Sequence, residues 1–340
     1  MLPIPPFFDP ATVPTIWQVP YQQRANEARD WRRRHQIPSA AQDALRVSLL
    51  LVDIQNTFCQ PGFELYVGGR SGTGAVDDNR RLCEFIYRNL NGITEICPTM
   101  DTHQAGQIFH SLFLVNEVGD HPEPYTTISL QDLKKGVWRF NAALAPGLNL
   151  TAEEGQRHIE HYARELQSRG KYELTIWPYH AMLGGIGHAL VSAVEEAVFF
   201  HGICRLSQPD FQVKGQNPLT ENYSVLRPEV TTGPAGEPVD AKNLKFIRKL
   251  LNFDAVIIAG QAKSHCVAWT IEDLLNEIRA TGQPLAEKVY LLEDCTTPVV
   301  IPDVMDYTEQ ADQAFRKFAD AGMHLVQSTV PMHEWPAFGN

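Results

Sequence analysis

Cys266 stands where an apolar run, "VIIAG", gives way to a segment with the spacing of an amphipathic helix. The first amide groups of a helix have no partner within the helix, and its dipole is positive there, so a thiolate at this position would be favoured. The same amides could hold the oxyanion of a tetrahedral intermediate. The alternative is a cysteine that only packs, because free cysteines are commonly buried. Cys266 is therefore a candidate nucleophile that needs chemical partners.

Two charged residues that also close apolar runs could be those partners. Asp53 follows "SLLLV" and Lys214 follows "DFQV". Asp53 could take the thiol proton and return it to a leaving amine, although alone it could equally cap a turn. Lys214 would lower the pKa of both neighbours if it lay within about 4 to 6 Å of them, but a single lysine before a glycine is more often a solvated turn residue. The three residues together at neighbouring strand ends favour a catalytic site.

A second set of residues, Asp101, His103 and His180, has the chemistry of a metal site. One carboxylate and two imidazoles suit a divalent transition metal such as zinc, iron or manganese. Strand alternation would point Asp101 and His103 to the same side, which allows shared ligation. The alternative is that the two histidines merely satisfy hydrogen bonds where loops begin.

The elements that must position these residues are strands that alternate with helices. Amphipathic segments such as "HALVSAVEEAVFF" separate apolar runs, which are "RVSLLLVDIQ", "ITEICPTMD", "YELTIWP", "DFQVKG", "FDAVIIAG", "KVYLLED" and "MHLVQS". This alternation predicts an α/β fold with three layers, α/β/α, around a mostly parallel, Rossmann-like sheet. Ligands bind beyond the carboxyl ends of the strands in such sheets, so the candidate residues are expected to converge there.

Three parts of the chain are expected. Residues 1–45 read as an arm and a charged helix that pack on a neighbour or on the body, residues 46–330 as the catalytic domain, and residues 331–340 as a tail. Residues 104–176 are too long for a simple connection and are predicted to be an insertion that shapes the site. The arm and the insertion suggest a homo-oligomer as a hypothesis.

The composition narrows the class of partner. The 340 residues carry a formal net charge of −11, which argues against a nucleic acid or an anionic membrane and favours a small molecule. No apolar run reaches the roughly 18 residues of a membrane span, and no secretory signal is visible, so a cytoplasmic location is expected. The six cysteines form no Cys-x-x-Cys pair, so neither a disulfide framework nor a thiolate zinc cluster is indicated.

Five ordered segments resemble the isochorismatase-like cysteine hydrolases, specifically their nicotinamidase branch. They are "LLLVDIQNTF", "TMDTH", "WPYHAMLGG", "VKGQNPLTENYS" and "AGQAKSHCV", and they span about residues 46 to 330. The resemblance implies a hydrolase of the C–N bond of a small carboxamide, with nicotinamide as the leading candidate. It implies that Asp53, Lys214 and Cys266 are the family's Asp-Lys-Cys triad, in which Cys266 is the nucleophile and Asp53 the proton shuttle.

The resemblance also implies the surroundings of the triad. A cis peptide would fall at Gln261-Ala262, and the amides of Ala262 and Cys266 would form the oxyanion hole. Phe58 and Trp177 match aromatic positions that flank a pyridine ring. The remaining matches are the metal ligands Asp101, His103 and His180, for which zinc is expected and iron or manganese are alternatives.

The sequence departs from the family at two positions near the predicted metal. Many nicotinamidases carry a histidine where Phe109 stands, and the histidine here comes one residue later, at His110, so no third imidazole ligand is assigned. Ala181 replaces a cysteine that is not the nucleophile. Other functions stay open, namely hydrolysis of another amide or ureide, hydrolysis of an isochorismate-type vinyl ether, or a non-catalytic binding or assembly module.

Overall fold

The computed structural model describes residues 1–282, 284–336 and 338, and its centre is one sheet of six strands. The strand order is β12-β9-β8-β1-β2-β7, and every neighbouring pair is parallel. The bounds are β1 Val47–Val52, β2 Glu95–Asp101, β7 Gln212–Lys214, β8 Ala255–Gly260, β9 Val289–Leu292 and β12 His324–Val326. The predicted parallel α/β sheet is confirmed.

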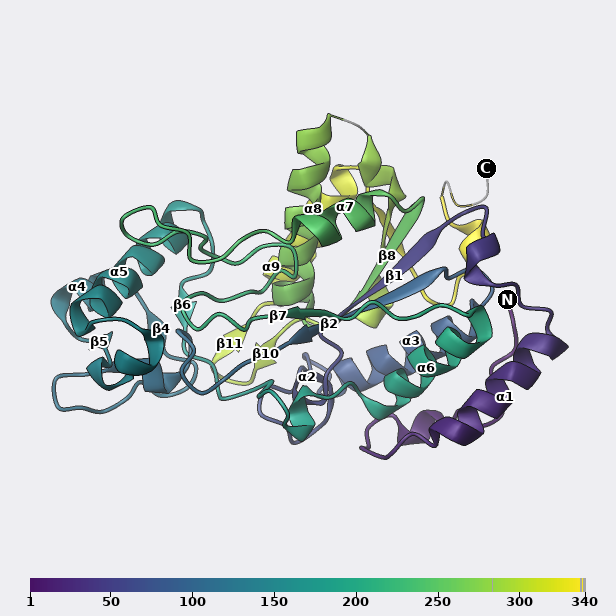
Figure 1. The fold of residues 1–340 in the computed structure, drawn as a ribbon, viewed down its shortest axis with the longest axis horizontal. Helices are drawn as coiled ribbons and strands as arrows, with labels where there is room; N and C mark the ends of the chain where they lie inside the picture. The colour runs from purple at the N-terminus through teal and green to yellow at the C-terminus, as the bar shows by residue number, and fades with distance from the viewer. Residues whose placement is uncertain (283, 337, 339–340) are drawn as a thin grey trace.

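Helices cover both faces of this sheet (Figure 1). One face carries α3 and α6, and the other carries α7, α8 and α9. Because both faces are covered, every residue of β1 and β8 is buried, which explains why these strands read as continuous apolar runs. The helix bounds are α2 Asn56–Cys59, α3 Gly74–Arg88, α6 Ser192–Arg205, α7 Leu244–Leu251, α8 Ala268–Thr281 and α9 Thr308–Asp320.

The predicted insertion forms a lobe beyond one end of the sheet, at the left of Figure 1. Its longest helix, α5, begins at a capping box in which Thr151 and Glu154 satisfy each other's backbone N–H groups. Two small antiparallel pairs, β3 with β5 and β4 with β6, hold the lobe together. The bounds are β3 Leu114–Val115, β4 Thr127–Ile128, α4 Leu130–Lys135, β5 Arg139–Phe140, α5 Ala152–Ser168 and β6 Leu174–Thr175.

The prediction that "YELTIWP" is a strand of the parallel sheet is wrong. Only Leu174–Thr175 of this run is a strand, and it pairs antiparallel with Thr127–Ile128 inside the insertion. An apolar run shows that a segment is buried, but it does not show which partner the segment pairs with. His180 therefore reaches the site from the end of the insertion rather than from a strand of the central sheet.

The N-terminal arm packs on its own body. Its helix α1 (Tyr21–Arg34) lies along α6, where Arg24 forms an ion pair with the buried Glu196 and Trp31 is buried. The Leu2 amide donates to the Arg88 carbonyl oxygen at 2.8 Å. Of the predicted tail 331–340, residues 337, 339 and 340 lie outside the described residues, while Trp335 is buried and stacks on Phe85.

Short elements complete the chain. Two strands, β10 Val300–Ile301 and β11 Met305–Asp306, form an antiparallel pair that precedes α9. Short helical turns lie at Pro10–Thr12, Ala40–Gln42, Ser111–Phe113, Ala142–Leu144, Pro146–Leu148, Ile186–His188, Lys263–Val267, Leu285–Lys288, Glu293–Cys295 and Met332–Glu334. Across residues 1–282, 284–336 and 338, no helix combines the length and apolar character that a membrane span requires.

Candidate active site

Asp53, Lys214 and Cys266 converge at the carboxyl edge of the sheet, each from a different strand. The Lys214 Nζ lies 2.9 Å from an Asp53 carboxylate oxygen and 3.7 Å from the Cys266 Sγ. It also lies 2.9 Å from Asp101 Oδ1 and donates to the Asn222 backbone carbonyl oxygen at 2.7 Å. One buried ammonium group thus contacts both carboxylates and the thiol that the sequence singled out.

The conformation of Asp53 is unusual and is held from β2. Its φ of 47° lies in the left-handed region, which residues other than glycine rarely adopt. The Thr99 hydroxyl accepts from the Asp53 N–H at 2.9 Å and donates to the Asp53 carboxylate. Thr99 therefore fixes both the backbone and the carboxylate of Asp53, which aims its other oxygen at Lys214.

Burial governs the protonation of these three groups. It raises the pKa of the Cys266 thiol well above its usual value, although the Lys214 charge opposes it. Burial also raises the pKa of Asp53, again against Lys214. For Lys214 burial lowers the pKa, but the Asp101 and Asp53 carboxylates outweigh it and the net pKa is well above the usual value. The expected thiolate is therefore not favoured in the free site, because desolvation outweighs the nearby charge.

Three histidines, rather than the predicted two, gather beside the triad. One ring nitrogen from each of His103, His110 and His180 lies within 4.8 Å of the others. Each of the three Nδ1 atoms faces a backbone carbonyl oxygen, at 3.2 Å for His103, 3.1 Å for His110 and 2.7 Å for His180. A neutral imidazole whose Nδ1–H donates has its lone pair on Nε2. In that tautomer each ring has an Nε2 lone pair available to a metal, and the carbonyl oxygen at Nδ1 fixes the orientation of the ring, as is common at metal sites.

Asp101 lies close to two of these histidine rings, in a position that suits a shared metal ion. Its Oδ1 lies 3.0 Å from the His103 Nε2, and its Oδ2 lies 3.9 Å from the His180 Nε2. Two acceptors at 3.0 Å repel each other unless a proton or cation lies between them. Gly215 leaves space here, since a Cβ at this position would come within 2.8 Å of Asp101 Oδ1 and 2.9 Å of the His103 Nε2. The nitrogen and carboxylate set fits a divalent transition ion.

Burial keeps two of these histidines neutral. Burial lowers the pKa of His110 to about 4, and it lowers the pKa of His180 well below its usual value. Among the part of the chain that is described, the His110 Nε2 is buried and makes no hydrogen bond. A buried, neutral and unpaired ring nitrogen is ready to bind a metal without losing a proton.

Cys266 itself lies in a π-helical turn, Lys263–Val267, that leads into α8. The peptide bond between Gln261 and Ala262 is cis. The Gln261 backbone N–H donates to the Val52 carbonyl oxygen at 2.8 Å, and its side chain donates to Asp78 at 2.8 Å. The backbone and the side chain of Gln261 are thus both bound to the body of the protein.

A narrow cavity joins the predicted substrate and metal residues. Its walls include Phe58 and Trp177, and the remaining lining residues are Leu65, Val67, Asp101, His103, His180, Glu221, Asn222, Tyr223, Ala262, His265, Cys266 and Val299. Its volume is about 30 Å³, enough for roughly two water molecules. A ring substrate therefore requires some lining side chains to move outward.

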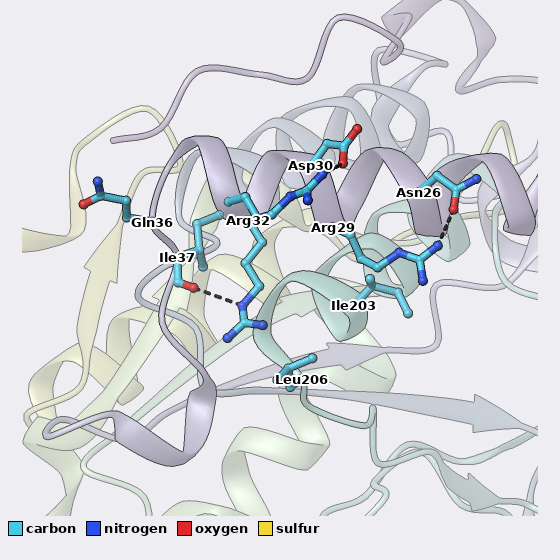
Figure 2. A pocket seen from close by; sticks show the side chains of 9 residues that line it. Asn26, Arg29, Asp30, Arg32, Gln36, Ile37, Ile203 and Leu206 are labelled. Carbon is cyan, nitrogen blue, oxygen red and sulfur yellow. Dashed lines mark hydrogen bonds and ion pairs between the residues drawn. The ribbon is translucent and has the colours of Figure 1, made fainter.

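A much larger groove lies elsewhere, between α1 and the end of α6 (Figure 2). It measures about 920 Å³ and is lined by Arg29, Arg32 and Arg33 over the apolar side chains of Ile203 and Leu206, among others. The arginines lie near the carboxyl ends of both helices, where positive side chains stabilise the helix dipole. Among the described residues that line this groove there is no cysteine or histidine.

The sequence reasoning missed three polar residues of the site. His110 was passed over because it stands one position from the family's histidine, and Glu221 lies inside the quoted segment "VKGQNPLTENYS" without having been singled out. His265 precedes Cys266, and its Nδ1 lies 2.8 Å from the Ser264 hydroxyl oxygen. Burial lowers the pKa of His265 to about 3. Periodicity cannot find such residues, because their pairing depends on how separate loops fold together.

Comparisons with known proteins identify the fold of this chain. No family model matches the sequence, and no curated protein matches it. Solved structures do match: the Acinetobacter baumanii nicotinamidase pyrazinamidase aligns at a TM-score of 0.50 and 17% identity over 85% of this chain and 99% of that chain. The yeast nicotinamidase Pnc1p aligns at a TM-score of 0.52 and 19% identity over 82% of this chain and 99% of that chain. The protein shares the fold of these enzymes.

Proposed function

We propose that this protein is a nicotinamidase-related cysteine hydrolase of the isochorismatase-like type, which cleaves a small carboxamide, with nicotinamide as the leading candidate. The observation that carries the proposal is the buried Lys214 Nζ, which lies 2.9 Å from Asp53 and 3.7 Å from the Cys266 Sγ. A cysteine, a carboxylate and a cation in this arrangement can form and break an acyl-enzyme. The fold shared with solved nicotinamidases supports the same reading.

In the acylation step the Cys266 sulfur attacks the carbonyl carbon of the amide. Asp53 takes the thiol proton, which suits a base whose pKa is raised by burial, and then gives the proton to the leaving nitrogen. The C–N bond breaks, ammonia leaves and a thioester remains. The Ala262 and Cys266 amides hold the oxyanion.

In the deacylation step the same groups act on water. Asp53 accepts a proton from the water molecule, whose oxygen attacks the thioester carbon. The C–S bond breaks, and the proton returns to the Cys266 sulfur as the carboxylic acid leaves. The Lys214 ammonium lies between the two carboxylates throughout and offsets the negative charge that moves between Asp53 and the Cys266 sulfur.

Residues in and beside the cavity would bind and orient the ring. His103, His110, His180 and Asp101 would hold a divalent ion, most simply zinc, which supplies a Lewis acid that orients a heteroaromatic ring through its nitrogen. The Trp177 ring is fixed by a hydrogen bond from its Nε1 to the Tyr223 hydroxyl, at 3.0 Å. Aromatic side chains of this kind flank flat substrates well.

The experiment is ammonia release from nicotinamide and from a panel of other small amides by the purified protein. We expect release from at least one amide, its loss in Cys266→Ala, and a strong decrease after the metal is removed by a chelator. Cys83→Ala is the matched control, because Cys83 is also a buried cysteine but does not line the cavity. Turnover that survives in Cys266→Ala would disprove the mechanism, and silence on all amides would disprove the amidohydrolase assignment.

A further inference from the structure

His265 is a buried imidazole in the wall of the cavity, directly before Cys266, and the mechanism gives it no role. It is only 4% exposed, and its Nε2 makes no hydrogen bond within residues 1–282, 284–336 and 338. Aromatic rings surround it, with centroids between 4.7 and 5.6 Å from its own, and they belong to Tyr172, Trp177, Tyr223 and Tyr307. The faces of such rings accept hydrogen bonds only weakly. Folded proteins rarely leave a buried polar atom unpaired, so this nitrogen is a candidate contact for a ligand.

The contacts of Ser264 show which ring nitrogen of His265 carries the proton. The Ser264 Oγ accepts from the Val299 N–H at 3.0 Å and lies 2.8 Å from the His265 Nδ1. If Nδ1 carried the proton, the serine oxygen would accept two hydrogen bonds, and its own O–H would have no acceptor in the described part of the chain. If the serine donates to Nδ1 instead, both groups are satisfied. The proton of the neutral ring therefore lies on Nε2, which is a hydrogen-bond donor without an acceptor.

The position of this Nε2 limits the acceptor that a substrate can offer. The atom itself is buried although its ring lines the cavity, so a substituent that projects beyond a substrate ring reaches it more readily than an atom of the ring does. The wall also includes the carboxyl groups of Asp101 and Glu221, which disfavour an anionic substituent. In the proposed function, the nitrogen of the substrate ring faces the three-histidine group. A neutral oxygen substituent is the acceptor that remains for His265.

We propose that His265 is a specificity-determining residue, whose Nε2–H donates a hydrogen bond to a neutral oxygen substituent of the substrate, and that Ser264 is the positioning residue that holds this tautomer. The substrate class is then a carboxamide that carries a hydroxyl or keto oxygen besides the group under attack. This inference rests on the proposed function. A methyl group at the same place would leave a buried donor unpaired, which costs affinity, whereas an oxygen of similar size accepts the hydrogen bond.

The test compares hydroxyl and methyl substituents, which have nearly the same size and differ in hydrogen bonding. Nicotinamides that carry a hydroxyl group, or its keto tautomer, at each free carbon of the ring are paired with the corresponding methyl compounds. We expect the hydroxyl-to-methyl ratio of kcat/KM at one ring position to be at least ~10-fold higher in the wild type than in His265→Phe.

The serine variants sharpen this comparison. Ser264→Ala removes the donor to Nδ1 and should lower the same ratio several-fold, because the tautomer is no longer fixed. Ser207→Ala is the matched control and should leave the ratio unchanged. The Ser207 hydroxyl also forms a hydrogen bond, to the Thr94 carbonyl oxygen at 2.9 Å, but Ser207 does not line the cavity. If His265→Phe fails to fold, Ser264→Ala and Ser207→Ala still decide the outcome.

Two measurements without turnover separate this inference from the proposed function. The same pairs of amides are titrated calorimetrically into Cys266→Ala and into the double variant with His265→Phe. A hydroxyl preference that is present in the first and lost in the second supports the role of His265 even if the wild-type protein hydrolyses none of the amides. Nitrogen-15 NMR of histidine-labelled protein should show the proton of His265 on Nε2, with both tautomers present in Ser264→Ala.

Four outcomes would overturn the inference. They are equal hydroxyl-to-methyl ratios with and without the His265 imidazole, a proton on Nδ1 in the wild type, a uniform loss of both members of every pair in His265→Phe, and no binding of any of these amides. Absence of ammonia release together with a retained hydroxyl preference in binding would instead contradict only the proposed function.

Discussion

The cavity and the α1–α6 groove both gather charged side chains, but the two regions differ in how far water reaches them. Directly behind the cavity wall, where Lys214 contacts Cys266 and Asp101, the Lys214 side chain is 2% exposed and that of Asp53 is fully buried. In the groove the ion pair between Arg33 and Asp30 joins side chains that are 79% and 60% exposed. Coulomb interactions strengthen several-fold when water is excluded, so of these two regions it is the buried charges beside the cavity that can steer a reaction. Cavity volume alone would have pointed to the groove rather than to the candidate active site.

The largest effect is expected for Lys214→Met, which removes the buried cation beside the cavity. Asp53 and Asp101 would then face each other without the ammonium that lies 2.9 Å from each, and one of them would have to bind a proton. We expect kcat/KM to fall by at least ~1,000-fold, because the base and the charge balance are lost together. Steady-state ammonia release measures it.

The matched control for that change is Lys317→Met. Lys317 also forms an ion pair, with Glu272 at 2.7 Å, but its side chain is 53% exposed. An exposed pair of this kind contributes roughly 0 to 1 kcal/mol, so both activity and stability should remain near wild type. Equal losses of activity in Lys214→Met and Lys317→Met would show that burial does not decide which ion pair matters for function.

The second effect concerns stability at the end of α6, directly beside the groove. The Arg205 side chain is fully buried, and it donates to the backbone carbonyl oxygens of Ile93 and Pro38 and to the Asp43 carboxylate. Arg205→Met leaves the Asp43 charge and both carbonyl oxygens without this partner, so the free energy of unfolding should fall by about 3 kcal/mol. Urea denaturation measures it, and a change below about 1 kcal/mol would contradict the argument.

The sheet and the residues at its strand ends could be predicted because both follow from local patterns. Continuous apolar runs identified β1, β2, β8 and β9, and the rule that ligands bind at the carboxyl edge brought Asp53, Lys214 and Cys266 together. The assignment of "YELTIWP" failed for the opposite reason. Its pairing partner, Thr127–Ile128, lies inside the insertion, and no periodicity of the run itself encodes that choice.

The chemistry contributed by the insertion could not be predicted in the same way. His110 reaches His103 and His180 only because the chain after β2 folds back, and a one-residue offset from the family pattern hid it. The pKa of Cys266 was also misjudged, since a sequence shows the start of a helix but not the depth of burial. A local sequence pattern predicts which residues lie at the end of a strand. The path of a loop and the desolvation of a side chain depend on the complete fold.

The third effect tests the contribution of the insertion to the metal site. His110→Ala removes one of the three facing imidazoles, and we expect the affinity for zinc to fall by roughly 10- to 100-fold. Competition with a chromophoric chelator on metal-free protein measures this independently of turnover. His121→Ala is the control, because His121 lies in the same insertion but is exposed and outside the three-histidine group. An unchanged affinity would leave His110 as a packing residue only.

The smallest effect is expected in the groove itself. Arg33→Gln removes a charge that is 79% exposed, and water together with salt screens the lost interaction with Asp30. The free energy of unfolding should change by less than about 0.5 kcal/mol, and kcat/KM for the preferred amide should be unchanged. Denaturation and ammonia release in parallel measure both. A several-fold loss of activity in Arg33→Gln would mean that an exposed, distant charge acts on the cavity, and the contrast between buried and exposed charges would no longer explain where the function lies.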